Sequence, residues 1–449
     1  MRPVAFREGT EPIVGRRHRS GDAFLTKVSA REGVAMSSPL LRLRESLASV
    51  LQFAPLEFRP LQRRLRRSVS VADMRRLAKR RLPRGVFDYI DGGAEDERTL
   101  NANCDAFAKV TFRPRVLQGV GEIDVAGCVL GETTAFPFIM APTGFTRIAD
   151  PQGELAVARA AQRAGLPYTL STLATRSIEE VRAAAPDARL WFQVYAWRNR
   201  ELVAEMVQRA AECRYEALVL TVDTAVFGRR ERDLRRGFSL PPKIGPGTLI
   251  DGALHPEWTL SFLRSEPIRF ANVVGTGVGD GSSPVDLAGY INSQFEPGLS
   301  WADVEWLRSL WPGPIIVKGI QTVEDARIAA DVGVAAIALS NHGGRQLDDA
   351  PAIFDLVAPV ADAVGGRMEI ICDGGIRRGS DIVKAMAAGA TSCMGGRAYL
   401  YALGAAGEAG VDQLLATWRE DIRRTLALLG VSSFAELDRS FLDGVAAST

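Results

Sequence analysis

Eight short apolar runs between residues 138 and 397 constrain the fold more than any other feature of the chain. Each is rich in Val, Ile and Leu and is separated from the next by a helix-like segment or a longer insertion. Such alternation is typical of parallel strands buried on both faces, so it predicts an α/β fold, a (β/α)8 TIM barrel. An open doubly wound sheet is the competing arrangement, but it does not require eight units with polar residues at every strand end. The runs are 138–143, 168–172, 190–195, 217–223, 314–319, 335–341, 369–375 and 392–397.

The sixth run ends in a loop that carries His342 and Arg345. The chain has three histidines, and only His342 follows an apolar run and precedes two glycines, which let the backbone bend. A buried histidine satisfied by the turn is the simpler interpretation. Arg345 favours a functional one, because a base beside a guanidinium suits a substrate with a removable proton next to a carboxylate.

Two glycine-rich turns follow the seventh and eighth runs, at residues 373–379 and 395–397. In a (β/α)8 barrel the loops after these strands commonly bind phosphate, because glycine lets backbone N–H groups approach the oxygens. Arg377 and Arg397 add positive charge, although ordinary turns also use glycine. Lys318 ends the fifth run, and a charged residue there is expected to point into the barrel mouth or to be paired.

The segment from Ser340 to Asp348 resembles the active-site signature of the FMN-dependent L-2-hydroxy acid dehydrogenases and oxidases. Glycolate oxidase, L-lactate dehydrogenase and mandelate dehydrogenase belong to this family. The resemblance extends from residue 69 to the C-terminus, and it implies a barrel domain over 69–449. It also implies FMN as the cofactor and oxidation of an L-2-hydroxy acid to the 2-oxo acid.

The resemblance further implies which residues contact FMN. Asp373 is expected at the ribityl chain, Lys318 beside flavin N1, and Arg377, Gly396 and Arg397 around the phosphate. The remaining cofactor positions are Pro142, Thr143, Gly144, Ser171, Gln193, Thr221, Ser340, Gly374 and Gly375.

The substrate contacts follow from the same resemblance. Tyr89 and Arg345 are expected to bind the carboxylate, and Tyr195 to hydrogen-bond the substrate hydroxyl. A second active-site arginine matches Arg230, with its neighbour Arg229 as the alternative assignment.

In the implied reaction, His342 takes a proton from the substrate while two electrons pass to flavin N5. Asp223 is expected to pair with His342 and to raise its pKa. Hydride transfer and a carbanion route both stay open at this point.

L-lactate is the first expectation for the substrate, and an aromatic acid such as mandelate is the alternative, because Leu173 stands where several glycolate-oxidising relatives have tryptophan. A peptide-derived substrate is a further alternative. Quinone, a cytochrome or oxygen is expected to receive the electrons.

Residues 1–68 form an arginine-rich extension that is expected to be partly disordered. The net charge of +2 gives no overall field for nucleic acid. The basic extension is the ground for the non-enzyme alternative, a flavin-binding, nucleic-acid-associated protein. Five scattered cysteines predict a reducing, cytoplasmic setting, with neither disulfides nor a metal site. No apolar stretch reaches the roughly 18 residues of a membrane span.

Between residues 224 and 300 the repeat is interrupted by a long insertion with many Gly and Pro residues. Loops of this length are usually functional, so we expect a lid over the barrel mouth. Packing on its own barrel is the competing interpretation, and peripheral contact with a membrane surface is another. Since relatives are usually homotetramers, the resemblance also implies that assembly.

Overall fold

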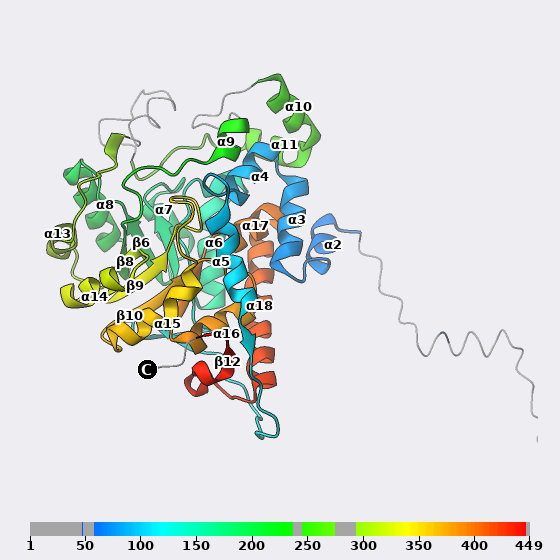
Figure 1. Ribbon diagram of the computed structural model, residues 1–449. Coiled ribbons are helices and arrows are strands. Elements are labelled where there is room, and N and C mark those ends of the chain that lie inside the picture. Colours follow the sequence, from blue (N-terminus) through cyan, green and yellow to red (C-terminus); the bar gives the residue numbers. More distant parts are fainter. Residues whose placement is uncertain (1–46, 48–57, 237–244, 274–292, 446–449) are drawn as a thin grey trace, which may run out of the picture. The chain divides into compact units, whose positions relative to one another are not determined.

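The structure, a computed structural model, describes residues 47, 58–236, 245–273 and 293–445 (Figure 1). The chain divides into two units, Met1–Leu56 and Glu57–Thr449, and every element named below belongs to the second. The predicted extension over 1–68 lies mostly outside the described residues, so its disorder and its boundary stay predictions.

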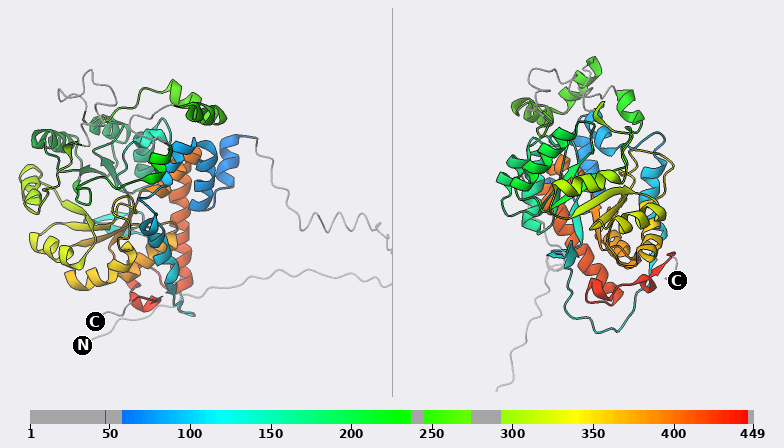
Figure 2. Two further views of the ribbon diagram at one scale, coloured as in Figure 1. Left: turned by 45° about the horizontal axis from the view of Figure 1, so that its top comes forward. Right: turned by 90° about the vertical axis from the view of Figure 1, so that its left-hand side faces the viewer.

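Eight parallel strands form a closed barrel, with helices around it (Figures 1 and 2). The barrel closes where the last strand pairs with the first, Cys393 lying opposite Phe138. Each predicted apolar run coincides with one strand to within a few residues, which confirms the predicted (β/α)8 barrel. The strands are β4 (Phe138–Met140), β5 (Tyr168–Ser171), β6 (Leu190–Val194), β7 (Ala217–Thr221), β8 (Ile315–Ile320), β9 (Ala336–Ser340), β10 (Glu369–Asp373) and β11 (Ser392–Gly395).

The surrounding helices begin and end at residues with recognisable local signals. Ser177 and Glu180 form a capping box at the start of α7, and Gly333, with a φ of +75°, follows the end of α14. These helices are α6 (Gly153–Ala164), α7 (Ile178–Ala184), α8 (Arg200–Glu212), α13 (Ala302–Leu310), α14 (Val323–Val332), α15 (Ile353–Val364), α16 (Gly379–Ala388), α17 (Arg397–Ala406) and α18 (Glu408–Leu429).

Alternation along the strands divides the core into two parts. One set, which includes Trp191, Val219, Ile316 and Ile371, is a buried cluster that fills the barrel interior. The other set faces the ring of helices. A hairpin of β2 (Gly127–Val129) and β3 (Glu132–Thr134) covers the amino-terminal end of the barrel, where the Gly131 N–H donates to Glu369 Oε1 at 3.3 Å. The opposite end is left for the functional site.

In the range 58–137, four helices precede the barrel: α2 (Pro60–Arg66), α3 (Val71–Arg81), α4 (Arg84–Asp91) and α5 (Arg98–Lys109). Ser70 caps α3, because its Oγ accepts a hydrogen bond from the Asp73 N–H at 3.2 Å. Helix α3 packs against α17, and α4 brings Tyr89 to the carboxyl-terminal end of the strands.

The insertion after β7 is only partly described, because 237–244 and 274–292 lie outside the described residues. Its described helices are α9 (Glu231–Arg236), α10 (Pro246–Leu254) and α11 (Pro256–Arg264). Helix α11 is held to the barrel by Trp258, whose Nε1 donates to the Ile148 carbonyl at 2.8 Å. Movement of this insertion as a lid stays a prediction. In the described part of the chain, no helix combines the length and the apolar character needed to cross a bilayer.

Candidate active site

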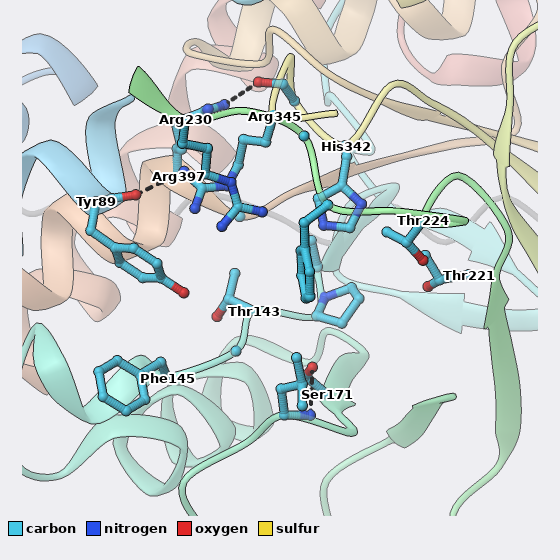
Figure 3. Close-up of a pocket in the computed structure, with 18 of the residues that line it drawn as sticks. Tyr89, Thr143, Phe145, Ser171, Thr221, Thr224, Arg230, His342, Arg345 and Arg397 are labelled. Atoms are coloured by element: carbon cyan, nitrogen blue, oxygen red, sulfur yellow. Dashed lines mark hydrogen bonds between the residues drawn. The ribbon is translucent and has the colours of Figure 1, made fainter. Parts of the chain in front are cut away.

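A cavity of about 520 Å³ opens at the carboxyl-terminal ends of the strands (Figure 3). This is the usual place for the active site of a (β/α)8 barrel. Arginine side chains and His342 occupy one side of the cavity, and Thr143, Phe145 and Ser171 line the opposite side (Figure 3). Fifteen predicted site residues line it: Tyr89, Pro142, Thr143, Gly144, Ser171, Gln193, Tyr195, Thr221, Arg230, Lys318, His342, Arg345, Asp373, Gly396 and Arg397.

Two more predicted residues lie directly behind the cavity wall. Asp223 contacts His342, and Ser340 contacts Lys318. Both side chains are buried, Ser340 completely and the Asp223 side chain to all but 1%. They therefore act on the cavity through the residues that line it.

The remaining three predicted residues do not line the cavity. Gly374 and Gly375 pack against α5, and a Cβ at Gly375 would lie 2.1 Å from the Asn103 carbonyl oxygen. This close approach explains glycine at that position. Arg377 donates from Nη1 to the neighbouring Ile376 carbonyl at 2.8 Å. A phosphate-binding role for these three residues stays a prediction.

The loop that follows β9 adopts a left-handed backbone at three successive residues. His342, Gly343 and Gly344 have φ angles of +56°, +66° and +71°. A Cβ at Gly344 would lie 2.5 Å from the Leu100 backbone nitrogen. Glycine is therefore required there both by the positive φ and by the lack of space for a side chain. His342 is a non-glycine residue in a sparsely populated conformation, which is found most often at functional sites. This turn aims the imidazole into the cavity.

His342 pairs with Asp223, whose Oδ1 lies 3.0 Å from Nδ1 of the imidazole. Removal of water by the surrounding protein lowers the pKa of His342; Asp223 raises it, as predicted, but by less, so the pKa lies below its ordinary value. The same pairing holds the pKa of Asp223 below its ordinary value, although burial opposes this. A neutral His342 with its proton on Nδ1 leaves Nε2 free to accept one.

Two arginines converge beside His342. Arg345 donates from Nη1 to the carbonyls of Tyr89 and Gly92, at 2.7 and 3.0 Å, and its guanidinium lies 5.1 Å from the centre of the Tyr89 ring. Arg230 is partly buried, and its buried Nε has no hydrogen-bond partner among the described residues. Burial lowers the pKa of Arg230 to about 10, with the neighbouring Arg345 contributing. Arg229 also lines the cavity, but 71% of its side chain is exposed, which favours Arg230 as the anion-binding residue.

Lys318 is buried at the base of the cavity, and its charge is paired with a carboxylate. Its Nζ lies 2.9 Å from both Ser340 Oγ and Asp373 Oδ2, and Ser340 Oγ donates to the same carboxylate at 2.8 Å. Burial opposes the charge, but Asp373 and Asp223 outweigh it and raise the pKa of Lys318. The ammonium ion is therefore a permanent positive charge in the cavity wall.

A family model described as FMN-dependent dehydrogenase matches residues 78–444 of this chain. The chain belongs to the FMN-dependent dehydrogenase family. Its membership confirms the resemblance inferred from the sequence, the FMN cofactor and the oxidation of a 2-hydroxy acid.

Curated members of the FMN-dependent dehydrogenase family align over most of the chain. It is 44% identical over 404 residues to a putative L-lactate dehydrogenase of Mycobacterium tuberculosis, covering 90% of this chain and 96% of the relative. It is 41% identical to an L-lactate dehydrogenase of Caulobacter vibrioides, over 83% of this chain and 97% of the relative. It is 40% identical to glycolate oxidase 3 of Oryza sativa subsp. indica, over 83% of this chain and 95% of the relative.

Among solved structures, that of the monotopic membrane protein (S)-mandelate dehydrogenase matches this chain with a TM-score of 0.80. The two chains are 41% identical, and the match covers 84% of this chain and 99% of that one.

The cavity suits the FMN on which the FMN-dependent dehydrogenase family relies. Gln193 lines it, and its buried Nε2 has no hydrogen-bond partner in the part of the chain that the structure describes. This unpartnered donor and the Lys318 ammonium match the carbonyl oxygens and the ring nitrogen at one edge of a flavin. Arg397 is partly buried, and its hydrogen bonds go to the carbonyls of Ile90, Gly92 and Gly343. Its charge is thus left available for a phosphate.

Sequence reasoning missed several residues that line the cavity. Most are apolar, among them Ile90, Phe145, Phe227, Leu234, Phe270 and Leu400; Thr224 and Asp233 are polar. The rings of Tyr89 and Phe145 meet edge to face at 6.3 Å, and the ring of Phe270 lies 5.8 Å from that of Phe145. Leu173 lies in the same wall. Phe145 follows the first predicted strand directly, and this position at a strand end was the one available signal.

Proposed function

We propose that the chain oxidises an L-2-hydroxy acid to the 2-oxo acid, with His342 as the base. The observation that carries the proposal is the His342–Asp223 pair facing the Arg230 and Arg345 guanidiniums in one cavity. FMN, when bound, supplies the acceptor for the two electrons. We assign its binding to Lys318 and to the cavity-lining residues that follow the strands: Pro142, Thr143, Gly144, Ser171, Gln193, Thr221, Asp373, Gly396 and Arg397.

The chain's own side chains divide the remaining work. Arg345 and Arg230 bind the substrate carboxylate, and Tyr89 donates its hydroxyl hydrogen to the same group. Tyr195 hydrogen-bonds the substrate hydroxyl, since burial raises the pKa of Tyr195 and keeps it a donor. His342 takes a proton at Nε2 and becomes an imidazolium ion, which the adjacent Asp223 carboxylate stabilises.

L-lactate is the substrate we propose first. It is the acid named in the two bacterial relatives at 44% and 41% identity. The apolar part of the wall, including Leu173 and Phe145, is compatible with a methyl group at C2, which requires no hydrogen-bond partner.

An aromatic 2-hydroxy acid is the second candidate. Leu173, Phe145, Phe227 and Phe270 give the cavity an apolar side on which a phenyl group gains area burial and edge-to-face contacts. The solved structure of an (S)-mandelate dehydrogenase, 41% identical to this chain, supports this candidate.

The test is anaerobic mixing of the FMN-loaded protein with L-lactate, L-mandelate and glycolate in turn, followed by the flavin absorbance. Loss of the oxidised flavin band with one acid supports the proposal and identifies the substrate class. Rapid recovery on admitting oxygen indicates an oxidase, and slow recovery indicates quinone or a cytochrome as the acceptor. Failure of every L-2-hydroxy acid to reduce the flavin contradicts the proposal.

A pair of histidine variants tests the base. His342→Gln is expected to retain FMN and to lose flavin reduction. His255→Gln is the matched control, because His255 pairs with Asp251 in the α10–α11 segment and does not line the cavity. Near-normal reduction in His342→Gln would exclude His342 as the base.

We also propose that the α10–α11 segment rests on an anionic lipid surface. Leu249, Ile250, Leu254 and Leu263 are each at least 64% exposed, and Arg264 beside them is exposed. The monotopic membrane neighbour supports this proposal, and peripheral membrane association then accompanies a cytoplasmic location. The protein is expected to sediment with phosphatidylglycerol vesicles, and a variant with Leu254 and Leu263 changed to Asp is expected to stay in the supernatant. Equal sedimentation of the variant and the unaltered protein contradicts the membrane proposal.

The homotetramer stays a prediction, to be checked by light scattering.

A further inference from the structure

Helix α9 carries cavity residues on a short element that needs outside support. Arg230 directly precedes the helix and Asp233 lies within it, and both line the cavity. The helix spans only six residues, Glu231–Arg236, which is too short to be stable by itself. What holds α9 in place therefore also places Arg230.

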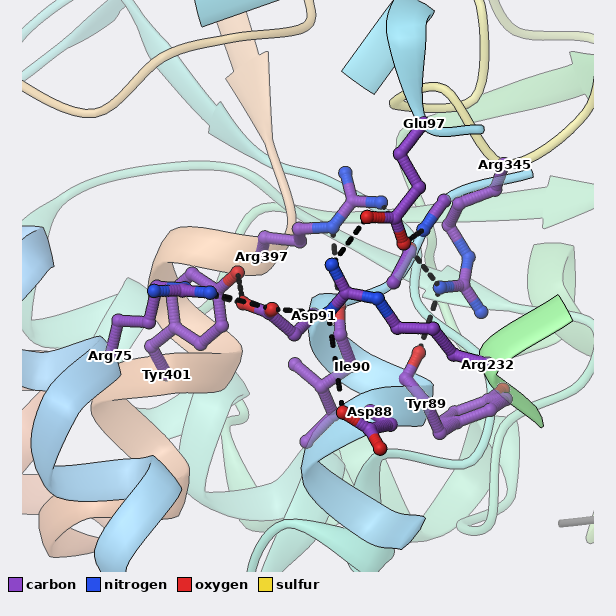
Figure 4. A network of polar contacts seen from close by, with 12 residues as sticks. Arg75, Asp88, Tyr89, Ile90, Asp91, Glu97, Arg232, Arg345, Arg397 and Tyr401 are labelled. Carbon is purple, nitrogen blue, oxygen red and sulfur yellow. Dashed lines mark hydrogen bonds and ion pairs between the residues drawn. The ribbon is translucent and has the colours of Figure 1, made fainter. Parts of the chain in front are cut away.

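Arg232 supplies this support by reaching away from the cavity to Asp91, the last residue of α4 (Figure 4). Its Nη1 donates to Asp91 Oδ2 at 2.8 Å, and its Nη2 pairs with Glu97. Asp91 also accepts from Arg75 Nη2 at 2.7 Å and from the Tyr401 hydroxyl at 2.7 Å. These five residues, the α9 anchor cluster, join α3, α4, α9, α17 and the α4–α5 loop.

The buried Asp91 carboxylate lies at the centre of the cluster. It faces the guanidinium groups of Arg75 and Arg232, and only 3% of its side chain is exposed. Arg232 also pairs with Glu97 and lies 4.0 Å from the Asp88 carboxylate. Burial opposes ionisation of Asp91, but bonds from Arg75, Tyr401 and Arg232 outweigh it and lower the pKa of Asp91 to about 2. A buried carboxylate with several bonded partners holds the elements around it in one arrangement better than an exposed pair does.

The cluster also reaches the second anion-binding arginine through the backbone. Asp91 is followed by Gly92, whose carbonyl accepts from Arg345 Nη1 at 3.0 Å and from Arg397 Nη2 at 2.7 Å. On the other side, the Glu95 N–H donates to the Arg229 carbonyl at 2.9 Å, one residue before Arg230. The end of α4 thus touches the supports of both Arg345 and Arg230.

We propose that Asp91 and Arg232 are positioning residues that set the spacing between Arg230 and Arg345 for the substrate carboxylate. The inference rests on the proposed carboxylate-binding role of these two arginines. Neither Asp91 nor Arg232 contacts His342 or Asp223 among the described interactions, so the proton-transfer pair is independent of the cluster. Loss of the anchor should therefore weaken binding of the acid much more than it slows the reaction once the acid is bound.

The experiment compares FMN-loaded Arg232→Gln, Arg232→Lys and Arg235→Gln with the unaltered protein. Arg235 is the matched control, because it lies on the same helix, is 71% exposed and pairs only with Glu231 in the described interactions. Two quantities are measured: the KM and kcat for the acid that reduces the unaltered protein, and the Kd of oxalate from the flavin absorbance. Oxalate is a small dicarboxylate with no removable proton.

Arg232→Gln is expected to raise the KM and the oxalate Kd at least tenfold, with kcat changed less than about threefold. Arg232→Lys is expected to recover part of the loss, and Arg235→Gln to show none. Unchanged KM and Kd in Arg232→Gln, or an equal loss in Arg235→Gln, overturns the inference. Should Arg232→Gln fail to fold, Arg232→Lys decides. A lysine keeps the positive charge but cannot bond Asp91 and Glu97 at once, so a raised KM and oxalate Kd support the inference and unchanged values overturn it. If no L-2-hydroxy acid reduces the unaltered protein, the proposed function has failed, and the oxalate Kd alone decides the inference.

Discussion

Replacing Asp223 by Asn is expected to slow flavin reduction by about three orders of magnitude. Asn keeps the shape of the side chain but removes the negative charge that lies beside Nδ1 of His342 at 3.0 Å. The charge matters because proton transfer to His342 creates a cation next to it. Asp223 is almost completely buried, so water screens this interaction little.

The magnitude follows from the distance. Unit charges about 4 Å apart attract by about 4 kcal/mol at an effective dielectric constant of about 20. Because about 1.4 kcal/mol corresponds to a tenfold change in rate, losing this attraction in the transition state costs about a thousandfold. The substrate is bound by other residues, so its affinity should change little.

The assay is anaerobic stopped-flow reduction of the bound flavin by a saturating 2-hydroxy acid, repeated across pH. His342 must be neutral to accept a proton, and its pKa is below the ordinary value. The unaltered rate is therefore expected to be constant near neutral pH and to fall only in acid. Since Asp223 raises the pKa of His342, removing its charge should move this acid limb to lower pH.

Two results would refute this reasoning. One is a reduction rate in Asp223→Asn within tenfold of the unaltered protein, and the other is an acid limb that moves to higher pH. The control is Asp251→Asn, which alters the other described histidine–carboxylate pair, Asp251 with His255, outside the cavity. Its rate is expected to be unchanged.

Three further predictions concern stability and are measured by denaturant unfolding. Gly344→Ala should lower the free energy of unfolding by at least about 2 kcal/mol, because φ is +71° and the new Cβ meets backbone at 2.5 Å; no loss would contradict the turn geometry. Lys318→Met should cost about 3 kcal/mol by leaving the buried Asp373 without its cation, whereas a neutral effect would deny the pair a structural role. The pKa of Asp91 is lowered to about 2 in the folded protein, so its ionised form should add about 2 kcal/mol to the free energy of unfolding above pH about 4. This contribution should be lost as the pH falls toward 2. Asp91→Asn should reduce the dependence of the unfolding free energy on pH in this range, and an unchanged pH dependence would count against the prediction.

The barrel and most of the cavity lining could be predicted from the sequence because both follow local rules. Strands buried on both faces read as continuous apolar runs, and polar residues at their carboxyl-terminal ends meet at one mouth. Lys318 was placed in the cavity wall in this way, and Gln193 through the family resemblance; both line the cavity. Each observed strand is shorter than its apolar run or shifted by a residue.

What sequence reasoning missed depends on contacts between distant segments. Asp91 and Arg232 are separated by 141 positions, and neither belongs to a local pattern that identifies a partner. The contact of Phe145 with Phe270 likewise needs the folded insertion. The raising effect of Asp223 on the pKa of His342 could be predicted from the sequence, but the larger lowering effect of burial could not, because a sequence names the charged neighbour and not the depth of burial.

Closure of the barrel through β4 and β11 has a consequence for how the protein is made. The partner of β4 is synthesised roughly 250 residues after it, so at about 5–20 residues per second the ribosome needs some tens of seconds to supply it. During that interval one edge of β4 lacks its neighbour and can pair with other chains. The cavity is also incomplete, because Gly396 and Arg397 emerge last among the residues that line it, apart from Leu400. We therefore expect FMN to bind only after β11 has been synthesised. A nascent chain stalled before β11 is expected to be a target for chaperones.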